Sequence, residues 1–384
     1  MSSRTIAATR VEPAIASPED QRVTFVELFF DLVFVFCITQ VVGLLHDGIT
    51  WTAVGQAVLA FWLIWWAWTQ FTWALNAADT TNHRVQLATL IATAVAFFLA
   101  VAVPQAFREG ALWFAVPYVL VRAVGLGVYG WVAESNPSQH AAVRKFTLVS
   151  TGGLVAVLAG AFLGGSLQYA VWGLAILLDI IAAGIGAQQE GWDLHPEHFG
   201  ERHGLIIIIA LGETLIVAAA GLGSAVWSLQ LVAVAVLAVA LSCALWWTYF
   251  TRIKPQLDHA LESCTGSVQS SMARDVFSLV HFPMLCGVIA YAAAIENAVA
   301  HPTDPFSGSV RLVLAIGLAL FVEGLALATW RASGRVLLPR IVLGALTALA
   351  VVGAGGVPPA VSLALGLVGV TAVAFWEHRS EQPA

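Results

Sequence analysis

Charged residues are scarce in this chain. Only 10% of its 384 residues are Asp, Glu, Lys or Arg, whereas about a quarter are charged in an average soluble domain. Hydrophobic residues make up 59% of the sequence and the mean hydropathy is +0.84, which excludes an ordinary soluble fold and indicates a lipid environment. The net charge of −6 is not accompanied by a basic patch, so no nucleic-acid partner is expected.

Paired cysteines and a cleavable leader are also missing. The four cysteines form no CxxC motif, so neither a disulfide framework nor a thiolate zinc site is indicated, and no cofactor is predicted. The polar first residues lack an apolar region followed by a small-residue cleavage site. We expect three parts: a cytosolic N-terminal tail (1–23), a polytopic transmembrane domain (24–378) and a cytosolic C-terminal tail (379–384).

Long apolar runs, by contrast, fill the sequence. Because a helix needs about 20 mostly apolar residues to cross the hydrocarbon layer, these runs predict an all-α integral membrane protein with a bundle of about twelve transmembrane helices. The runs are continuous and not alternating, which favours helices over a β-barrel. The predicted spans are 24–46, 54–75, 85–107, 112–133, 147–164, 168–187, 203–222, 227–250, 276–298, 308–328, 335–353 and 359–377.

The distribution of positive charge predicts the orientation of these spans. Fourteen of the 17 Lys and Arg residues fall on the side of the N-terminus, two (Arg108 and Arg311) fall on the other side, and Arg122 lies inside a span. Because Lys and Arg are retained on the cytosolic side, we expect both termini to be cytosolic (N-in, C-in) in a multi-pass protein of the inner (plasma) membrane. The longest loops, 188–203 and 251–275, are expected on the same side.

An internal repeat is suggested by an offset of 180 residues. This offset aligns Arg22 with Arg202 and Trp66 with Trp246. Two parallel sets of six helices, a 6+6 repeat, would suit a two-lobed transporter. A chance match explains so few aligned positions equally well.

Ionisable residues inside the spans are the main functional signal, because each costs roughly 2.5–3.5 kcal/mol near the bilayer centre. Glu27 and Asp31 are four residues apart on one helix, so they lie on one face about 6 Å apart. Two ionised carboxylates at that distance repel each other, so the pair is expected to share a proton or a bound cation. In the alternative interpretation Glu27 pairs with a loop arginine such as Arg22.

Glu213 and Arg122 are predicted near the midplane of their spans. They either form a structural ion pair or belong to a gated polar site. Gly212, which precedes Glu213, would let a neighbouring helix or a ligand approach the backbone closely.

Histidines and aromatic residues give weaker signals. His195, His198, Glu201 and His203 are compatible with metal ligation, but their spacing favours a hydrated loop that caps the following helix. His281, beside Pro283, is interpreted either as a proton relay or as a partner of the carbonyl that the proline frees. Trp65, Trp66 and Trp246 are candidates for the wall of an organic or cationic ligand site, or are interfacial anchors.

Two motifs carry a resemblance to a known family. VELFFDLVFVF (26–36), followed by Thr39-Gln40, and FGERHGL (199–205), which runs into IALGET (209–214), resemble the bacterial low temperature requirement A proteins. His203 departs from the pattern, where an aromatic residue is more usual. The resemblance implies a membrane protein linked to growth in the cold and draws attention to Glu201 and Arg202, but it implies no reaction or substrate.

Three functional hypotheses remain open from the sequence. The first is a secondary transporter or channel-like protein that binds a proton or cation at Glu27, Asp31 and Glu213, with Arg122 as counter-ion. The second is an enzyme acting on a lipid or isoprenoid with carboxylate-bound Mg²⁺, although no DDxxD motif occurs. The third is a non-catalytic protein of membrane adaptation. Membrane lipid and a proton, cation or small molecule are the expected partners, and the oligomeric state is left open.

Overall fold

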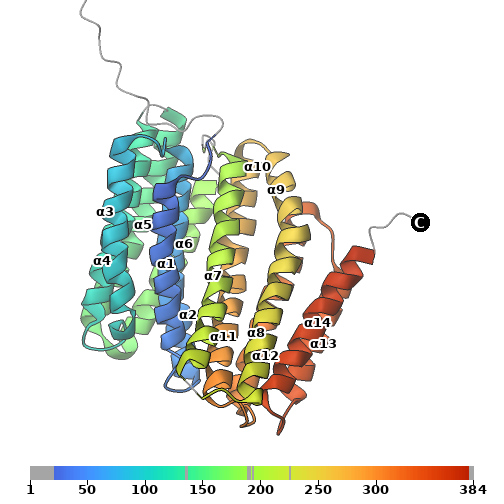
Figure 1. The fold of residues 1–384 in the computed structure, drawn as a ribbon. Coiled ribbons are helices and arrows are strands. Elements are labelled where there is room, and N and C mark those ends of the chain that lie inside the picture. The colour runs from blue at the N-terminus through green and yellow to red at the C-terminus, as the bar shows by residue number, and fades with distance from the viewer. Residues whose placement is uncertain (1–20, 135–136, 188–191, 193, 225, 380–384) are drawn as a thin grey trace, which may run out of the picture.

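The computed structural model is a bundle of long helices (Figure 1). It describes residues 21–134, 137–187, 192, 194–224 and 226–379, and this part of the chain forms helices without strands. The helices are α1 Phe25–Gly43, α2 Trp51–Ala77, α3 His83–Ala102, η1 Val103–Gln105, α4 Ala111–Ala133, α5 Pro137–Leu163, α6 Gly165–Ala187, α7 Pro196–Ser224, α8 Leu229–Thr248, η2 Tyr249–Ile253, α9 Lys254–Glu262, α10 Gly266–Met272, η3 Ala273–Val280, α11 His281–Ala300, α12 Gly308–Ser333, α13 Leu338–Gly353 and α14 Pro359–Arg379.

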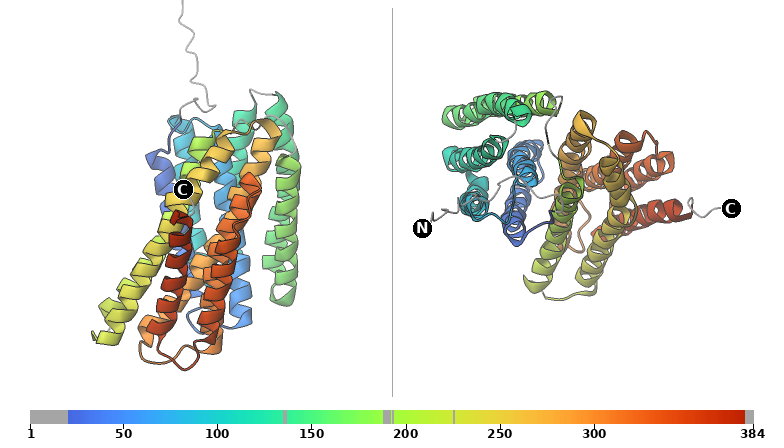
Figure 2. Two further views of the ribbon diagram at one scale, coloured as in Figure 1. Left: turned by 90° about the vertical axis from the view of Figure 1, so that its right-hand side faces the viewer. Right: turned by 90° about the horizontal axis from the view of Figure 1, so that it is seen from above.

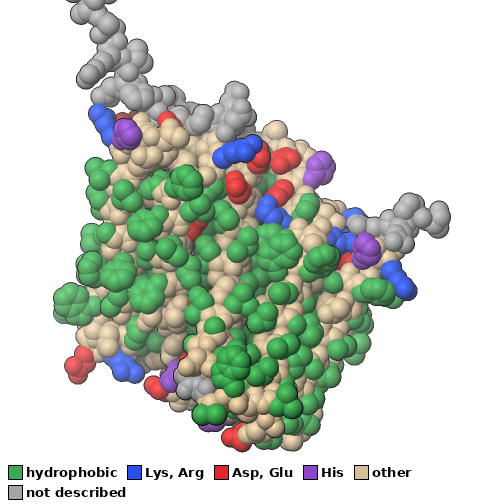
Figure 3. Space-filling view, in the orientation of Figure 1, with side chains coloured by type: hydrophobic (Ala, Val, Ile, Leu, Met, Phe, Trp, Pro, Cys, Tyr) green, Lys and Arg blue, Asp and Glu red, His purple; other side chains and the backbone are tan. Residues whose placement is uncertain are grey.

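The helices have the length and surface of membrane spans. Within the described residues, eleven helical segments are long and apolar enough to cross a membrane, and α13 is a shorter apolar helix of 16 residues. Hydrophobic side chains cover the middle of the molecular surface, while most charged side chains in view gather near its upper side (Figure 3). Each of the twelve predicted spans coincides with one apolar helix, so the predicted all-α multi-pass membrane bundle is confirmed.

The two long loops predicted on one side of the membrane are largely helical, which corrects the sequence prediction. α7 begins at Pro196, so the second half of the 188–203 segment forms the first turns of that helix. The 251–275 segment contains the end of the π-helical turn η2, the helices α9 and α10, and the start of the π-helix η3. Several of their apolar side chains, including Leu257 and Leu261, are fully buried, which explains why these polar-looking segments fold against the bundle.

Six neighbour relations of the first six helices recur in the rest of the chain, whereas the α2/α4 packing has no comparable counterpart between α8 and α12. In the first half, helix pairs α1/α2, α1/α3, α3/α4, α4/α5, α5/α6 and α2/α6 pack together. In the second half the corresponding pairs are α7/α8, α7/α11, α11/α12, α12/α13, α13/α14 and α8/α14. Helices α1 and α7 begin on the same side of the bundle, which we call the N-terminal face and which is uppermost in Figure 1. This arrangement agrees with the suggested 6+6 parallel repeat.

The two halves meet through four helices at the centre of the molecule. α1 packs against α7 and α11, and α2 also packs against both of them. Seen from above, α3 to α6 and α12 to α14 lie on opposite sides of this centre (Figure 2). The central helices therefore contribute side chains from both halves to the same interior.

Candidate functional site

The N-terminal end of α1 holds the first carboxylate of the site. Both the backbone N–H and the hydroxyl of Thr24 donate to Glu27 Oε2, at 2.9 Å each. This is a capping box, in which the third residue of the helix reaches back to the residue before the helix. Glu27 and Asp31, one turn further along, are both completely buried. The local helix start therefore fixes one oxygen of Glu27 and leaves the other facing α7.

α7 supplies the positive charge to this carboxylate pair. Arg202 donates through Nη1 to Glu27 Oε1 at 3.3 Å and through Nη2 to Asp31 Oδ1. Asp31 Oδ1 also accepts from the indole N–H of Trp68 on α2 at 2.7 Å, and the guanidinium lies 5.6 Å from the centre of the Trp68 ring. The alternative pairing of Glu27 with Arg22 is thus replaced by a pairing with Arg202 across the interface between the halves.

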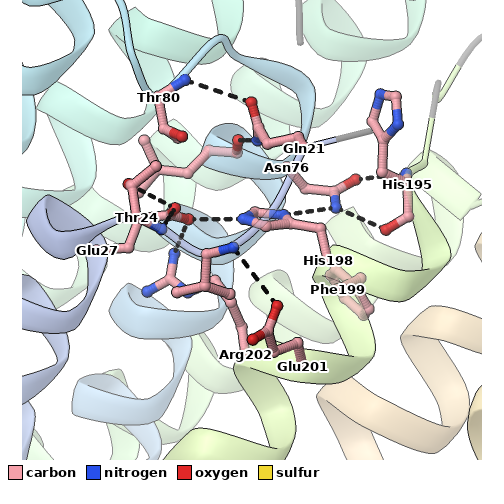
Figure 4. A network of polar contacts seen from close by, with 12 residues as sticks. Gln21, Thr24, Glu27, Asn76, Thr80, His195, His198, Phe199, Glu201 and Arg202 are labelled. Carbon is pink, nitrogen blue, oxygen red and sulfur yellow. Dashed lines mark hydrogen bonds and ion pairs between the residues drawn. The ribbon is translucent and has the colours of Figure 1, made fainter. Parts of the chain in front are cut away.

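His198, one turn before Arg202, completes the cluster (Figure 4). Its Nε2 lies 2.9 Å from Glu27 Oε1, and its Nδ1 lies 3.1 Å from the amide nitrogen of Asn76. The Asn76 amide is oriented by His195, because its oxygen accepts from the His195 N–H and its nitrogen donates to the His195 carbonyl, both at 2.9 Å. The amide nitrogen therefore donates to Nδ1, so the proton of a neutral His198 is on Nε2 and points at Glu27.

The cluster contains one more acidic group than it has fixed positive charges. Glu27 and Asp31 face the single guanidinium of Arg202. His198 adds no fixed positive charge in this arrangement, because a second proton on its ring would point at the N–H of Asn76. Two polar atoms of the cluster, Asp31 Oδ2 and Arg202 Nε, have no hydrogen-bond partner among the described residues. Because an unpaired buried polar atom is costly, a further partner at these two atoms would stabilise the cluster.

Two further histidines, His203 and His281, lie next to the cluster. The His203 ring packs edge-on against Trp65 and Trp68, and 5.5 Å separates its centroid from that of His281. His281 Nδ1 is 2.9 Å from the Val276 carbonyl and Nε2 is 2.9 Å from the Tyr249 hydroxyl. The sequence prediction that His281 pairs with the carbonyl freed by Pro283 is wrong, because the partner belongs to the π-helix η3. His203, the departure from the family pattern, takes the place of an aromatic ring.

Arg122 lies elsewhere, within the first half. Its guanidinium donates to Asp179 on α6 at 3.1 and 3.2 Å and to the Tyr118 hydroxyl at 2.7 Å. It is also bonded to Gln70 of α2, whose side-chain amide donates back to the Arg122 carbonyl at 3.0 Å. The Glu213–Arg122 ion pair considered from the sequence is therefore wrong.

Glu213 also faces α1, but further along the helix than Glu27 and Asp31. It is buried, and Oε2 accepts from the Thr39 hydroxyl at 2.6 Å. Glu296 on α11 is near enough to act on the charge of Glu213. No atom lies within 4 Å of a Cβ built on Gly212, so the predicted close approach of a neighbouring helix is wrong, and the approach of a ligand stays a prediction.

Glu296 forms an ion pair with His46 beyond the end of α1. His46 Nδ1 lies 2.7 Å from Glu296 Oε1, and the histidine is mostly exposed. The hydrogen bond to Glu296, together with the negative charge of that residue, raises the pKa of His46 above its usual value of 6.5. Acidic groups thus occur on α1 and α7 near the N-terminal face, in mid-helix at Glu213, and again near the opposite face.

The remaining candidate residues are not part of the cluster. Glu201 is exposed, with Oε2 3.5 Å from the Val23 N–H. Trp65 contacts His203, Trp66 lines a separate pocket, and Trp246 is 40% exposed and stacks on Phe250. In the part of the chain that the structure describes, His, Cys, Asp and Glu side chains form no group of three that could hold a metal ion.

Sequence reasoning missed the roles of His198, Asn76 and Trp68. A signal for the first was present, because His198 and Arg202 are separated by four residues, as are Glu27 and Asp31. Two helices with matching i, i+4 pairs of opposite character can face each other. Asn76 and Trp68 gave no comparable signal, since an amide and an indole in an aromatic-rich span look like packing or interfacial residues.

Taken together, the fold and its buried polar residues define a multi-pass, all-helical membrane protein. The chain belongs to the bacterial low temperature requirement A protein (LtrA) family, whose model matches residues 22–375. It is also similar to the uncharacterized protein RA0937 of Rhizobium meliloti (strain 1021), with 28% identity over 331 residues that cover 83% of this chain and 80% of the relative. No solved structure matches the chain.

Proposed function

We propose that this protein is a secondary transporter whose coupling site for a proton or cation is the buried cluster of Glu27, Asp31, His198 and Arg202. The observation that carries the proposal is the imbalance of charge in this cluster. Two carboxylates share one guanidinium, and one carboxylate oxygen of Asp31 has no partner among the described residues. A site that is satisfied by one added proton or cation, and that can lose it again, is what a coupled transporter requires.

The position of the cluster supports this role. The four residues come from α1 and α7, which belong to different halves of the bundle. Alternating-access transporters built from repeats commonly place their coupling sites at the interface between the repeats. Binding or release of a proton would change the attraction between α1 and α7, and hence the equilibrium between two arrangements of the halves.

We further propose that the N-terminal face is cytosolic and that the membrane is the bacterial inner membrane. The support is the excess of Lys and Arg on the side where α1 begins, since positive charge is retained on the cytosolic side. Reporter fusions after α2 and α3 test it: activity of a cytosolic reporter after α2 and of a periplasmic reporter after α3 is expected. The reverse pattern contradicts the orientation.

Flux through purified protein tests the transport function. In proteoliposomes with a pH-sensitive dye inside, an imposed proton or cation gradient should dissipate through the wild type. Glu27→Gln and Asp31→Asn should each reduce the flux at least about tenfold, because a neutral amide cannot exchange the proton. Glu201→Gln is the matched control, since Glu201 is an exposed carboxylate on the same helix as Arg202. Equal flux in Glu27→Gln, Asp31→Asn and wild type contradicts the proposal.

The link to cold growth is tested in a host strain. A deletion strain should grow poorly at low temperature and be rescued by the wild type but not by Glu27→Gln. The variant must be shown to reach the membrane in normal amount and with normal thermal stability. Rescue by a stable Glu27→Gln variant would favour the non-catalytic adaptation role instead.

A further inference from the structure

A second feature is a pocket walled by aromatic rings, whose lining comes mostly from the first half of the bundle and partly from the π-helix η3. The space among its lining atoms is about 470 Å³, which includes part of the open solvent. Trp66, Trp73, Tyr129, Phe146 and Trp192 supply the walls. Trp192, which precedes α7, packs edge-on against Trp73, Tyr129 and Phe146 with ring centroids 5.1 to 6.2 Å apart. The pocket therefore offers flat apolar surfaces from α2, α4 and α5.

Apart from the aromatic walls, the polar side chains among the described lining residues are two hydroxyls, an amide and a guanidinium, and none is a carboxylate. Thr69, Gln70, Ser278 and Arg274 complete the lining. Gln70 is occupied by Arg122, and the Ser278 hydroxyl accepts from the indole N–H of Trp73 at 3.0 Å. Thr69 is 2% exposed, and its hydroxyl has no hydrogen-bond partner among the described residues. A buried hydroxyl in a pocket wall needs a hydrogen-bond partner, which a ligand atom or a water molecule would supply.

Arg274 gives the pocket its charge. It pairs with Asp275, but Asp275 also accepts from Arg331 on α12 at 2.7 Å. One carboxylate is therefore shared by two guanidinium groups, which leaves an excess of positive charge beside the pocket among the described residues. Arginine is well suited to bind carboxylate or phosphate groups through its planar fork of donors.

α2 separates this pocket from the acid–base cluster. Trp66, Thr69, Gln70 and Trp73 lie three or four residues apart along one side of α2, whereas Trp68 lies on another side, where it bonds Asp31 of α1. A ligand in the pocket and a proton in the cluster therefore contact different sides of one helix. Such an arrangement can couple the two sites through a shift of α2.

We infer that the aromatic pocket is the substrate site, and that its substrate is a small organic anion with a flat apolar body, bound by the aromatic walls, the Thr69 hydroxyl and Arg274. Calling the bound anion a substrate rests on the proposed transport function, whereas the binding of the anion to the pocket does not depend on that function. An organic cation is disfavoured, since the charged group that the described lining residues supply is a guanidinium. A carboxylate on a soluble ring and the headgroup of an anionic lipid share the required chemistry.

Calorimetric titration of the full-length protein in detergent tests the inference without any gradient. The probes are 2-naphthoate and its matched cation, 2-naphthylmethylammonium. Naphthoate should bind and the cation should bind at least about tenfold more weakly. Equal or tighter binding of the cation overturns the inference. If naphthoate binds while proteoliposomes carry no flux, the proposed function fails and the binding site stands. If flux occurs but naphthoate does not bind, the binding site fails and the proposed function stands.

Three variants locate the binding site. Arg274→Gln should weaken naphthoate at least about tenfold, as expected for a lost hydrogen bond to a charged group. Thr69→Val should weaken it several-fold without lowering thermal stability, because the hydroxyl it removes has no protein partner. Arg331→Gln is the matched control, since Arg331 shares Asp275 but does not line the pocket. Equal losses in Arg274→Gln and Arg331→Gln, or unchanged affinity in Thr69→Val, overturn the assignment.

The source of the anion is distinguished in nanodiscs. If the natural ligand is a lipid headgroup, naphthoate affinity should fall when phosphatidylcholine is replaced by phosphatidylglycerol, and Arg274→Gln should abolish the difference. Equal affinity in both lipids assigns the site to a soluble anion. Should Arg274→Gln prove unstable, Arg274→Lys keeps the charge but loses the planar fork, and an intermediate affinity is then expected.

Discussion

Arg122 on α4 and Asp179 on α6 form an ion pair that is almost completely buried inside the first half of the bundle. Tyr118 and Gln70 also bond the guanidinium, so the arginine is held from three helices. Arg122 therefore stabilises the half that contains the aromatic pocket and is not a counter-ion for Glu213.

A double-mutant cycle should detect this pair. Arg122→Gln leaves Asp179 buried without its partner and is expected to lower the stability by about 3–5 kcal/mol. Asp179→Asn should be similarly harmful, and the double variant should lose less than the sum. The measurement is unfolding in detergent, and Glu213→Gln is the control. Coupling of Arg122 to Glu213 and not to Asp179 would contradict the arrangement.

Substitution of Arg202 should lower the stability to a similar extent. Arg202→Gln removes the only guanidinium from between Glu27 and Asp31, and the loss of a buried pair is expected to cost about 3–5 kcal/mol. Adding Asp31→Asn should recover part of the stability, because fewer buried charges remain. Arg335→Gln, at an exposed position, should be neutral in the same thermal assay.

The protonation of His198 should depend on Asn76. In Asn76→Asp a carboxylate replaces the amide nitrogen opposite Nδ1, so a doubly protonated imidazolium becomes favourable. We expect the ¹⁵N spectrum of labelled histidine to show a new imidazolium signal at neutral pH that disappears on adding His198→Gln. An unchanged spectrum would contradict the hydrogen-bond assignment of this ring.

The His46–Glu296 pair predicts a pH dependence of stability. Glu296 raises the pKa of His46, so the folded state holds the proton more tightly than the unfolded state. The stabilisation should be fully present below pH 6.5 and disappear as the pH rises through the raised pKa. Wild type should therefore be more stable than His46→Gln in acid and lose this advantage in mildly alkaline solution. His259→Gln, at an exposed position, serves as the control.

A close contact between helix backbones predicts the effect of a single methyl group. A Cβ on Gly287 of α11 would lie 2.5 Å from the backbone oxygen of Gly317 on α12, so the helices must separate to accommodate it. Gly287→Ala should lower the stability by about 1–3 kcal/mol, as overpacking does. Gly212→Ala, where no atom lies within 4 Å of the new methyl, should be neutral. Equal thermal stability of the two variants would contradict the α11–α12 packing.

The sequence predicted the fold far better than the site. Apolar runs identify spans directly, because backbone and side chains must both be satisfied in lipid. The helical start of α7 was missed because His195, His198 and Glu201 look like a hydrated loop, whereas His198 is in fact buried against α1 and α2. Partners such as Asp179 for Arg122 depend on how helices are arranged, which local patterns do not contain.

The repeat relation between α1 and α7 bears on how such a site could arise. Both carboxylates of the cluster come from α1, and both basic side chains come from α7. The positions 180 residues after Glu27 and Asp31 are Ile207 and Leu211. The same offset aligns Arg202 with Arg22, so a symmetric dimer of one half would place position 27 of one copy against position 22 of the other. Fusion of two copies into one chain frees each copy to diverge, so the carboxylate pair can be kept in one half and lost from the other.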